Sequence, residues 1–119
     1  MQYALLFYNP PASEIPAAQR EATIAQMLKD MMAWREELQR AGVFRTSLRL
    51  AGVEAATSLR RQGDRALASD GPFAETKEIL GGFALIECAD LDEALGWAKR
   101  CPLLRIGTIE VRPEFGPAR

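Results

Sequence analysis

The chain has 119 residues and a mass of 13.2 kDa, with 15 basic and 16 acidic side chains and a net charge of −1. A single domain of this size buries about two-thirds of its unfolded surface, so it needs no disulfide or metal to form a core. The sequence contains no histidine, which excludes Ser–His–Asp and Cys–His catalysis and all His-ligated metal sites. The near-neutral charge also makes direct binding to nucleic acid unfavourable.

Two cysteines, Cys88 and Cys101, lack the CxxC spacing of metal and redox motifs. We expect both to be reduced, buried thiols, with no metal and no cofactor. The apolar stretch at residues 1–8 is too short for a signal peptide, and no stretch approaches the roughly 20 apolar residues of a membrane span. A cytoplasmic protein without membrane contact is therefore expected.

The first two elements are predicted to be a strand and a long helix. Residues 2–8 carry apolar or aromatic side chains on both faces of a strand, which indicates a central strand covered on both sides. A helix over residues 17–41 would be about 37 Å long, against about 23 Å for a seven-residue strand. It should therefore overhang its sheet, which would suit packing on a second subunit, or break near residues 19–23. Its apolar stripe, interpreted as core packing rather than a ligand groove, comprises Ile24, Met27, Leu28, Met31, Trp34 and Leu38.

The remaining elements complete an α+β pattern. A strand is predicted at 44–50, followed by a polar and basic β-hairpin at 56–62 and 65–69. An apolar strand at 79–88 comes next, in which Gly81 and Gly82 would allow a bulge. A helix capped by Asp90 and Glu93 and ended by Pro102 precedes a last strand at 106–112. Without the inserted hairpin the order is β-α-β-β-α-β, the ferredoxin-like arrangement. We predict one domain over residues 1–113 and a frayed tail at 114–119.

The two-faced apolar strand also predicts an oligomer. In a ferredoxin-like fold both helices cover one face of the sheet and leave the other face open. Residues 2–8 offer apolar side chains to that open face as well. A second copy of the chain is the simplest way to cover it, so we expect a homodimer packed sheet to sheet.

A charged loop between apolar strands holds the candidate site. Residues 70–78 carry the carboxylates Asp70, Glu75 and Glu78 and the ammonium of Lys77. The stiff Gly-Pro turn after Asp70 fixes its direction, and Phe73 is expected to anchor the loop in the core. Asp70 is either a turn-forming residue or, if buried with a raised pKa, a catalytic acid or base. Glu75, Lys77 and Glu78 form either a solvated charged loop or part of a ligand site.

Two further charged residues lie on the last predicted strand. Glu110 and Arg112 are two positions apart and therefore share one face of that strand. They are interpreted as an ion pair at the rim of the dimer interface, or together with Asp70 as part of a shared cleft. Lys77 or Arg112 would hold an anionic substrate in such a cleft.

The loop at 70–78, Asp-Gly-Pro-Phe-Ala-Glu-Thr-Lys-Glu, and the following Gly81-Gly82-Phe83 resemble the signature of the DGPF branch of the YCII-related family. Similar stretches at the first strand, the helix end, the second helix and residues 109–113 extend the resemblance over nearly the whole chain. It implies a ferredoxin-like fold that dimerises as an α/β barrel, and no firmly assigned activity. Other YCII-like proteins are thought to use a His–Asp pair, which cannot exist here, so Asp70 would act without an imidazole partner.

Two functions follow as hypotheses. The first is a small-molecule-binding or enzymatic homodimer with a cleft near the loop at 70–78. The second comes from the resemblance, because proteins of this branch are often linked to extracytoplasmic-function sigma factors. It is a protein-interaction module that contacts a sigma factor through the basic hairpin that bears Arg60, Arg61 and Arg65.

Overall fold

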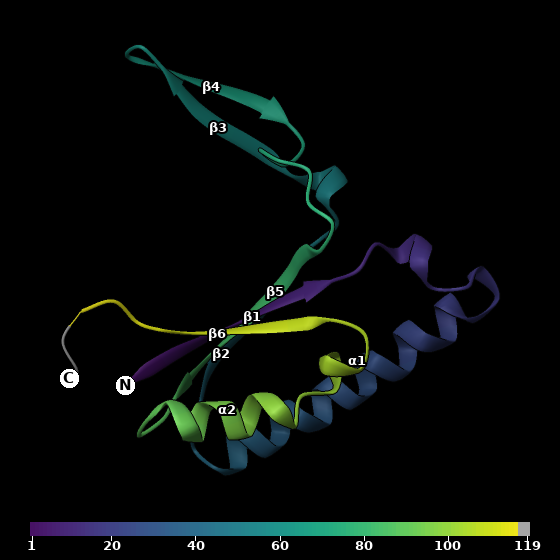
Figure 1. The fold of residues 1–119 in the computed structure, drawn as a ribbon, viewed down its shortest axis with the longest axis vertical. Helices are drawn as coiled ribbons and strands as arrows, with labels where there is room; N and C mark the ends of the chain where they lie inside the picture. The colour runs from purple at the N-terminus through teal and green to yellow at the C-terminus, as the bar shows by residue number, and fades with distance from the viewer. Residues whose placement is uncertain (117–119) are drawn as a thin grey trace.

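A computed structural model describes residues 1–116 and contains a four-stranded antiparallel sheet in the order β2-β5-β1-β6 (Figure 1). The elements are β1 (Gln2–Asn9), η1 (Ala12–Glu14), α1 (Ala17–Arg40), β2 (Phe44–Arg49), η2 (Val53–Ala55), β3 (Thr57–Gln62), β4 (Arg65–Asp70), β5 (Ile79–Glu87), α2 (Leu91–Lys99), η3 (Pro102–Arg105) and β6 (Thr108–Pro113). Strands β3 and β4 form a separate hairpin that projects away from the sheet. The predicted ferredoxin-like α+β fold with an inserted hairpin is confirmed.

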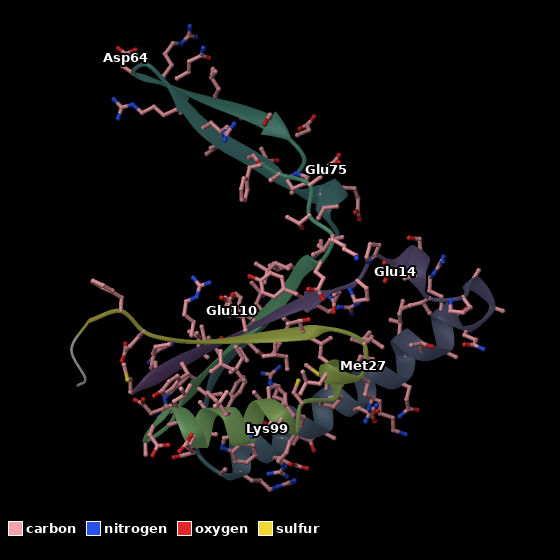
Figure 2. All side chains as sticks on the ribbon, viewed as in Figure 1. Glu14, Met27, Asp64, Glu75, Lys99 and Glu110 are labelled. Atoms are coloured by element: carbon pink, nitrogen blue, oxygen red, sulfur yellow. The ribbon has the colours of Figure 1, made fainter. Side chains whose placement is uncertain are left out.

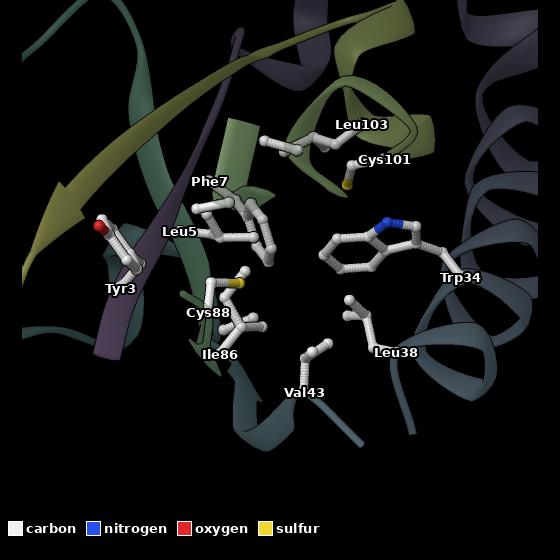
Figure 3. Close-up of a cluster of buried hydrophobic side chains, with 13 residues drawn as sticks. Tyr3, Leu5, Phe7, Trp34, Leu38, Val43, Ile86, Cys88, Cys101 and Leu103 are labelled. Atoms are coloured by element: carbon white, nitrogen blue, oxygen red, sulfur yellow. The ribbon is translucent and has the colours of Figure 1, made fainter. Parts of the chain in front are cut away.

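Both helices cover the same face of the sheet, and the core lies between them and β1 and β5 (Figures 1 and 3). Leu5, Leu38 and Ile86 are the largest fully buried side chains. The rings of Phe7 and Trp34 meet edge to face, with 6.1 Å between their centroids. The indole N–H of Trp34 donates to the carbonyl of Trp97 at 3.1 Å, which ties α1 to α2. The hydrogen bond satisfies the indole N–H of Trp34 while its ring buries apolar surface.

Helix α1 is continuous and overhangs the sheet. Its C-terminal half packs on the core through the buried residues Trp34 and Leu38. Its N-terminal half extends past the strands, so Ile24 and Leu28 are 38% and 39% exposed. Twenty-four helical residues span about 36 Å, more than the eight residues of β1 can cover. Of the two predicted alternatives, the structure shows the overhang.

The start of α2 is capped largely as predicted. A carboxylate oxygen of Asp90 accepts a hydrogen bond from the backbone N–H of Glu93 at 2.9 Å. The Glu93 carboxylate in turn accepts from the backbone N–H of Ala89 at 3.0 Å, one residue before the capping residue. These two bonds satisfy backbone donors that a helix N-terminus leaves free.

The paired glycines of β5 allow strands to approach closely. The register of β1 and β5 shifts between Phe7 and Tyr8, opposite Gly81, which is the predicted bulge. A Cβ atom added to Gly82 would lie 2.6 Å from the carbonyl oxygen of Leu48 on β2. Any larger residue at Gly82 would therefore push β2 away from β5.

Three details differ from the sequence-based expectations. Phe73 is 78% exposed, so its predicted role as a core anchor is wrong; the hairpin carries its loop away from the core. The last strand begins at Thr108 instead of residue 106, because the turn η3 continues into Gly107, whose N–H donates to the carbonyl of Leu103. The predicted frayed tail began at residue 114, but the Glu114 N–H donates to the carbonyl of Gln2 at 2.9 Å; residues 117–119 of that tail lie outside the described part of the chain. Within residues 1–116, no helix has the length and apolar character needed to cross a bilayer.

Both cysteines are buried and unbridged, as predicted. Burial raises the pKa of the Cys88 thiol and of the Cys101 thiol from 9.0 to about 11. Thiolates are the reactive species, so we expect both cysteines to react slowly with Ellman's reagent at pH 8 in the folded protein and rapidly in guanidinium chloride.

The same shifts predict a pH effect on stability. The folded state disfavours both thiolates, so this contribution to the free energy of unfolding is fully present below pH 9. It should decline as the pH rises from 9 toward 11. Cys88→Ser and Cys101→Ser variants, unfolded by urea at several pH values, isolate the contribution of each thiol. Rapid reaction of both thiols with Ellman's reagent at pH 8 in the folded protein would contradict the raised pKa values on which both predictions rest.

Candidate functional site

A polar cluster lies along the β6 edge of the open face of the sheet. Tyr8 on β1 lies opposite Thr108 on β6, and Glu110 and Arg112 follow on the same face. The Tyr8 hydroxyl donates to Glu110 at 3.2 Å, and the Arg112 guanidinium donates to the other carboxylate oxygen of Glu110 at 2.6 Å. The Thr108 hydroxyl donates to the carboxylate of Glu78 at 2.9 Å. The cluster thus joins β1, β6 and the end of the charged loop.

The charges within this cluster favour binding over proton transfer. The hydrogen bond from Arg112 lowers the pKa of Glu110 below its ordinary value. Desolvation, reinforced by Glu110, raises the pKa of the Tyr8 hydroxyl. Glu110 therefore stays ionised and Tyr8 stays protonated near neutral pH. A general acid or base works best with a pKa near the working pH, and neither group is tuned that way.

The structure brings together only part of the predicted site. Glu78, Glu110 and Arg112 meet at the cluster. Asp70 is exposed at the end of β4, and Glu75 and Lys77 are exposed on the following loop. Figure 2 shows Glu75 at the base of the hairpin and Glu110 on the sheet. Within residues 1–116, no hydrogen bond or ion pair connects Asp70, Glu75 or Lys77 to the cluster.

The turn after Asp70 is held by its backbone neighbours rather than by the Asp70 side chain. Gly71 has a φ of +91°, a conformation that side chains disfavour. Its N–H donates to the carbonyl of Ala56 at 2.7 Å, and the Ser58 hydroxyl donates to its carbonyl at 2.7 Å. The first glycine of the loop motif thus closes the hairpin base, which is a structural role.

A second site, on the helix-covered side, was not predicted. A groove of about 610 Å³ lies between the overhanging half of α1, strand β2 with residues 50–52, and the start of β5. We call it the α1 groove. Its volume falls within the range typical of small-molecule sites. Apolar lining residues include Phe7, Ile24, Met27, Met31, Trp34 and Phe44; Figure 2 locates Met27 on α1.

From the sequence, core packing was favoured over a ligand groove for the methionine stripe, so this groove was not predicted. The same periodicity marks both a core stripe and a groove wall. The groove could have been predicted from the difference in length between the helix at 17–41 and the strand at 2–8. This difference leaves the apolar residues in the N-terminal half of the helix without a sheet beneath them. Leu80, Gly81 and Gly82 also line the groove, so it begins directly after the charged loop.

One polar group of the groove lining is unusual. The side-chain oxygen of Asn9 is buried and accepts no hydrogen bond within the described residues. Gly81 permits the Asn9 amide to lie against the backbone of β5, because a Cβ atom at Gly81 would collide with the amide nitrogen.

The strand order, the helix-covered face and the groove beneath an overhanging helix define a small ferredoxin-like α+β protein with space for a small molecule. A family model for the YCII-related domain matches residues 1–115. The chain belongs to the YCII-related family. Its assignment to the DGPF branch stays a prediction from the loop sequence.

Two individual proteins are similar to this chain. "Uncharacterized protein R00369" of Rhizobium meliloti (strain 1021) is 38% identical over 115 residues, which are 95% of this chain and 91% of that protein. The 5-chloro-2-hydroxyhydroquinone dehydrochlorinase TftG of Burkholderia phenoliruptrix AC1100, solved in complex with 2,5-dihydroxybenzoquinone, aligns with a TM-score of 0.50 and 14% identity. That alignment covers 98% of this chain and 96% of TftG. At this identity the likeness concerns the fold.

Proposed function

We propose that the protein binds a small organic molecule in the α1 groove. The observation that carries this proposal is the groove itself, about 610 Å³ and lined mainly by apolar side chains that the overhang of α1 leaves partly uncovered. Unfilled apolar concavities of this size are the usual places for ligands. The ligand-bound structure of TftG supports the proposal at the level of the fold.

We further propose that the protein is a homodimer whose open sheet faces pack together. The centre of that face is apolar, and no helix covers it within residues 1–116 (Figure 1). Its residues are Ala4, Leu6, Leu48, Phe83 and Leu85. Leu48 is exposed and the others are only half-buried. In this arrangement the ion pair of Glu110 and Arg112 lies at the rim of the interface.

A fragment screen by saturation-transfer NMR tests the groove as a ligand site. We expect hits with wild-type protein to disappear in Met27→Trp, because the indole ring fills the groove. The control is Leu91→Trp, which places the same ring at an exposed position on α2, outside the groove. Hits that persist unchanged in Met27→Trp, or the absence of any hit with wild-type protein, would overturn the proposal.

The projecting hairpin favours a second function, the contact with a sigma factor. Arg60, Arg61 and Arg65 are exposed on it, as are the apolar residues Leu59 and Leu67. A two-stranded hairpin is only marginally stable alone in water, so such an arm gains from a partner. Co-purification with an extracytoplasmic-function sigma factor should be lost in the Arg60→Glu/Arg61→Glu variant. Recovery of the sigma factor equal to that with wild-type protein would contradict this second function.

A further inference from the structure

The charge of the α1 groove restricts what it can bind. Its lining residues include two arginines, Arg35 and Arg49, and no aspartate or glutamate within the described part of the chain. Neither guanidinium forms an ion pair within residues 1–116. Other arginines do: Arg100 pairs with Glu37 and Arg105 with Asp30. The lining therefore has net positive charge; the Glu54 carboxylate lies against Gly52 of the lining but forms no ion pair with either arginine.

The two arginines line the groove from different elements, Arg35 from α1 and Arg49 from β2. Arg49 ends β2 and pairs with Gly82 of β5. The guanidinium of Arg35, on α1, lies 4.8 Å from the centre of the Phe44 ring at the start of β2. Stacking holds the plane of the guanidinium and leaves its N–H edge available for a carboxylate.

The rest of the lining suits an apolar body. Methionine side chains at positions 27, 31 and 32 are flexible and polarizable, so they adapt to different apolar shapes. Phe7 and Trp34 add aromatic surface next to them. A lining of apolar side chains with two arginines that form no ion pair among the described residues matches a molecule with an apolar body and one acidic group.

We infer that the ligand class of the α1 groove is a small amphipathic organic acid, with its carboxylate on one of the two arginines, Arg35 or Arg49, and its apolar body against the methionine and aromatic side chains. This inference rests on the proposed function, because it names the ligand of the same groove. Charge-assisted hydrogen bonds to a guanidinium are about twice as strong as neutral ones. An acid should therefore bind more tightly than a neutral analogue of equal shape.

The test uses matched pairs of probes on the full chain. Isothermal titration calorimetry compares 2-naphthoate with 2-naphthamide, and 4-phenylbutyrate with 4-phenylbutyramide. We expect each acid to bind about tenfold or more tightly than its amide, since a hydrogen bond to a charged group contributes on the order of that factor. Rising salt should weaken the acids and leave the amides nearly unchanged.

Two variants locate the effect. Either Arg35→Gln or Arg49→Gln should reduce the advantage of the acid over the amide and so identify the arginine that binds the carboxylate. Arg45→Gln should not reduce it, because Arg45 lies on β2 outside the groove lining. Equal binding of acid and amide, or an advantage that survives in Arg35→Gln/Arg49→Gln, would overturn the ligand class while the proposed function stands. If no acid or amide binds and the fragment screen also finds no hit, the ligand class and the proposed function are both overturned. The same result is expected if a second copy of the chain fills the groove.

Discussion

Replacing Leu38 by alanine should lower the free energy of unfolding by about 2–5 kcal/mol. Leu38 is fully buried on α1, within the cluster that joins the helix to β1 and β5 (Figure 3). The substitution removes three carbon atoms from a packed site and leaves a cavity, and the rigid strands around it can relax only in part. Because domains are typically stable by about 5–15 kcal/mol, the loss is a large fraction of the total.

Urea unfolding followed by circular dichroism measures this effect, at one protein concentration because association adds to the apparent stability. The matched control is Leu59→Ala on the hairpin, where the leucine is 72% exposed. Surface substitutions of this kind usually change stability by about 0.5 kcal/mol or less. Equal losses in the two variants would show that α1 does not pack on the sheet as described.

Replacing Leu85 by aspartate should convert the proposed dimer into a monomer. Leu85 lies at the centre of the open face, opposite Ala4 on β1 and Thr46 on β2. In a sheet-to-sheet dimer the new carboxylate would be buried without a partner, which costs at least about 3 kcal/mol, or roughly 100-fold in the dissociation constant. Light scattering after gel filtration should show the 13.2 kDa of one chain instead of twice that mass.

The control for this variant is Leu91→Asp, which introduces the same charge at an exposed position in the first turn of α2. A carboxylate is well tolerated there, because it lies near the positive end of the helix dipole. Circular dichroism checks that both variants keep their secondary structure. A wild-type protein that elutes as a monomer at micromolar concentration, or a Leu85→Asp variant that stays dimeric, would refute the proposed interface.

Local chemistry was sufficient to predict most of the fold. The Asp90 cap, the glycine bulge in β5 and the two apolar strands depend on neighbouring residues and on periodicity, which the sequence displays directly. The ion pair of Glu110 and Arg112 also followed from their two-residue spacing on one strand face. Residues 2–8 are apolar on both faces of the strand, and this pattern correctly predicted that β1 is an inner strand of the sheet.

The position of the charged loop could not be predicted in this way. Phe73 is apolar and follows a proline turn, so burial was the reasonable expectation, yet the hairpin holds it in solvent. Asp70, Glu75 and Lys77 are close to Glu78 in sequence, but only Glu78 reaches the polar cluster, through Thr108 on a strand that is 30 residues away. Sequence proximity within a loop does not determine which of its side chains face the sheet.

By itself, the sequence determined the class of protein: the absence of histidine removed the common catalytic sets, and the order and character of the segments specified a ferredoxin-like α+β fold. Only the tertiary structure decided where a ligand could bind. The α1 groove exists because a 24-residue helix crosses a sheet of shorter strands, and because β2 with residues 50–52 forms a wall opposite the overhanging half of that helix. Both conditions depend on how distant segments are placed against one another, which no local pattern encodes.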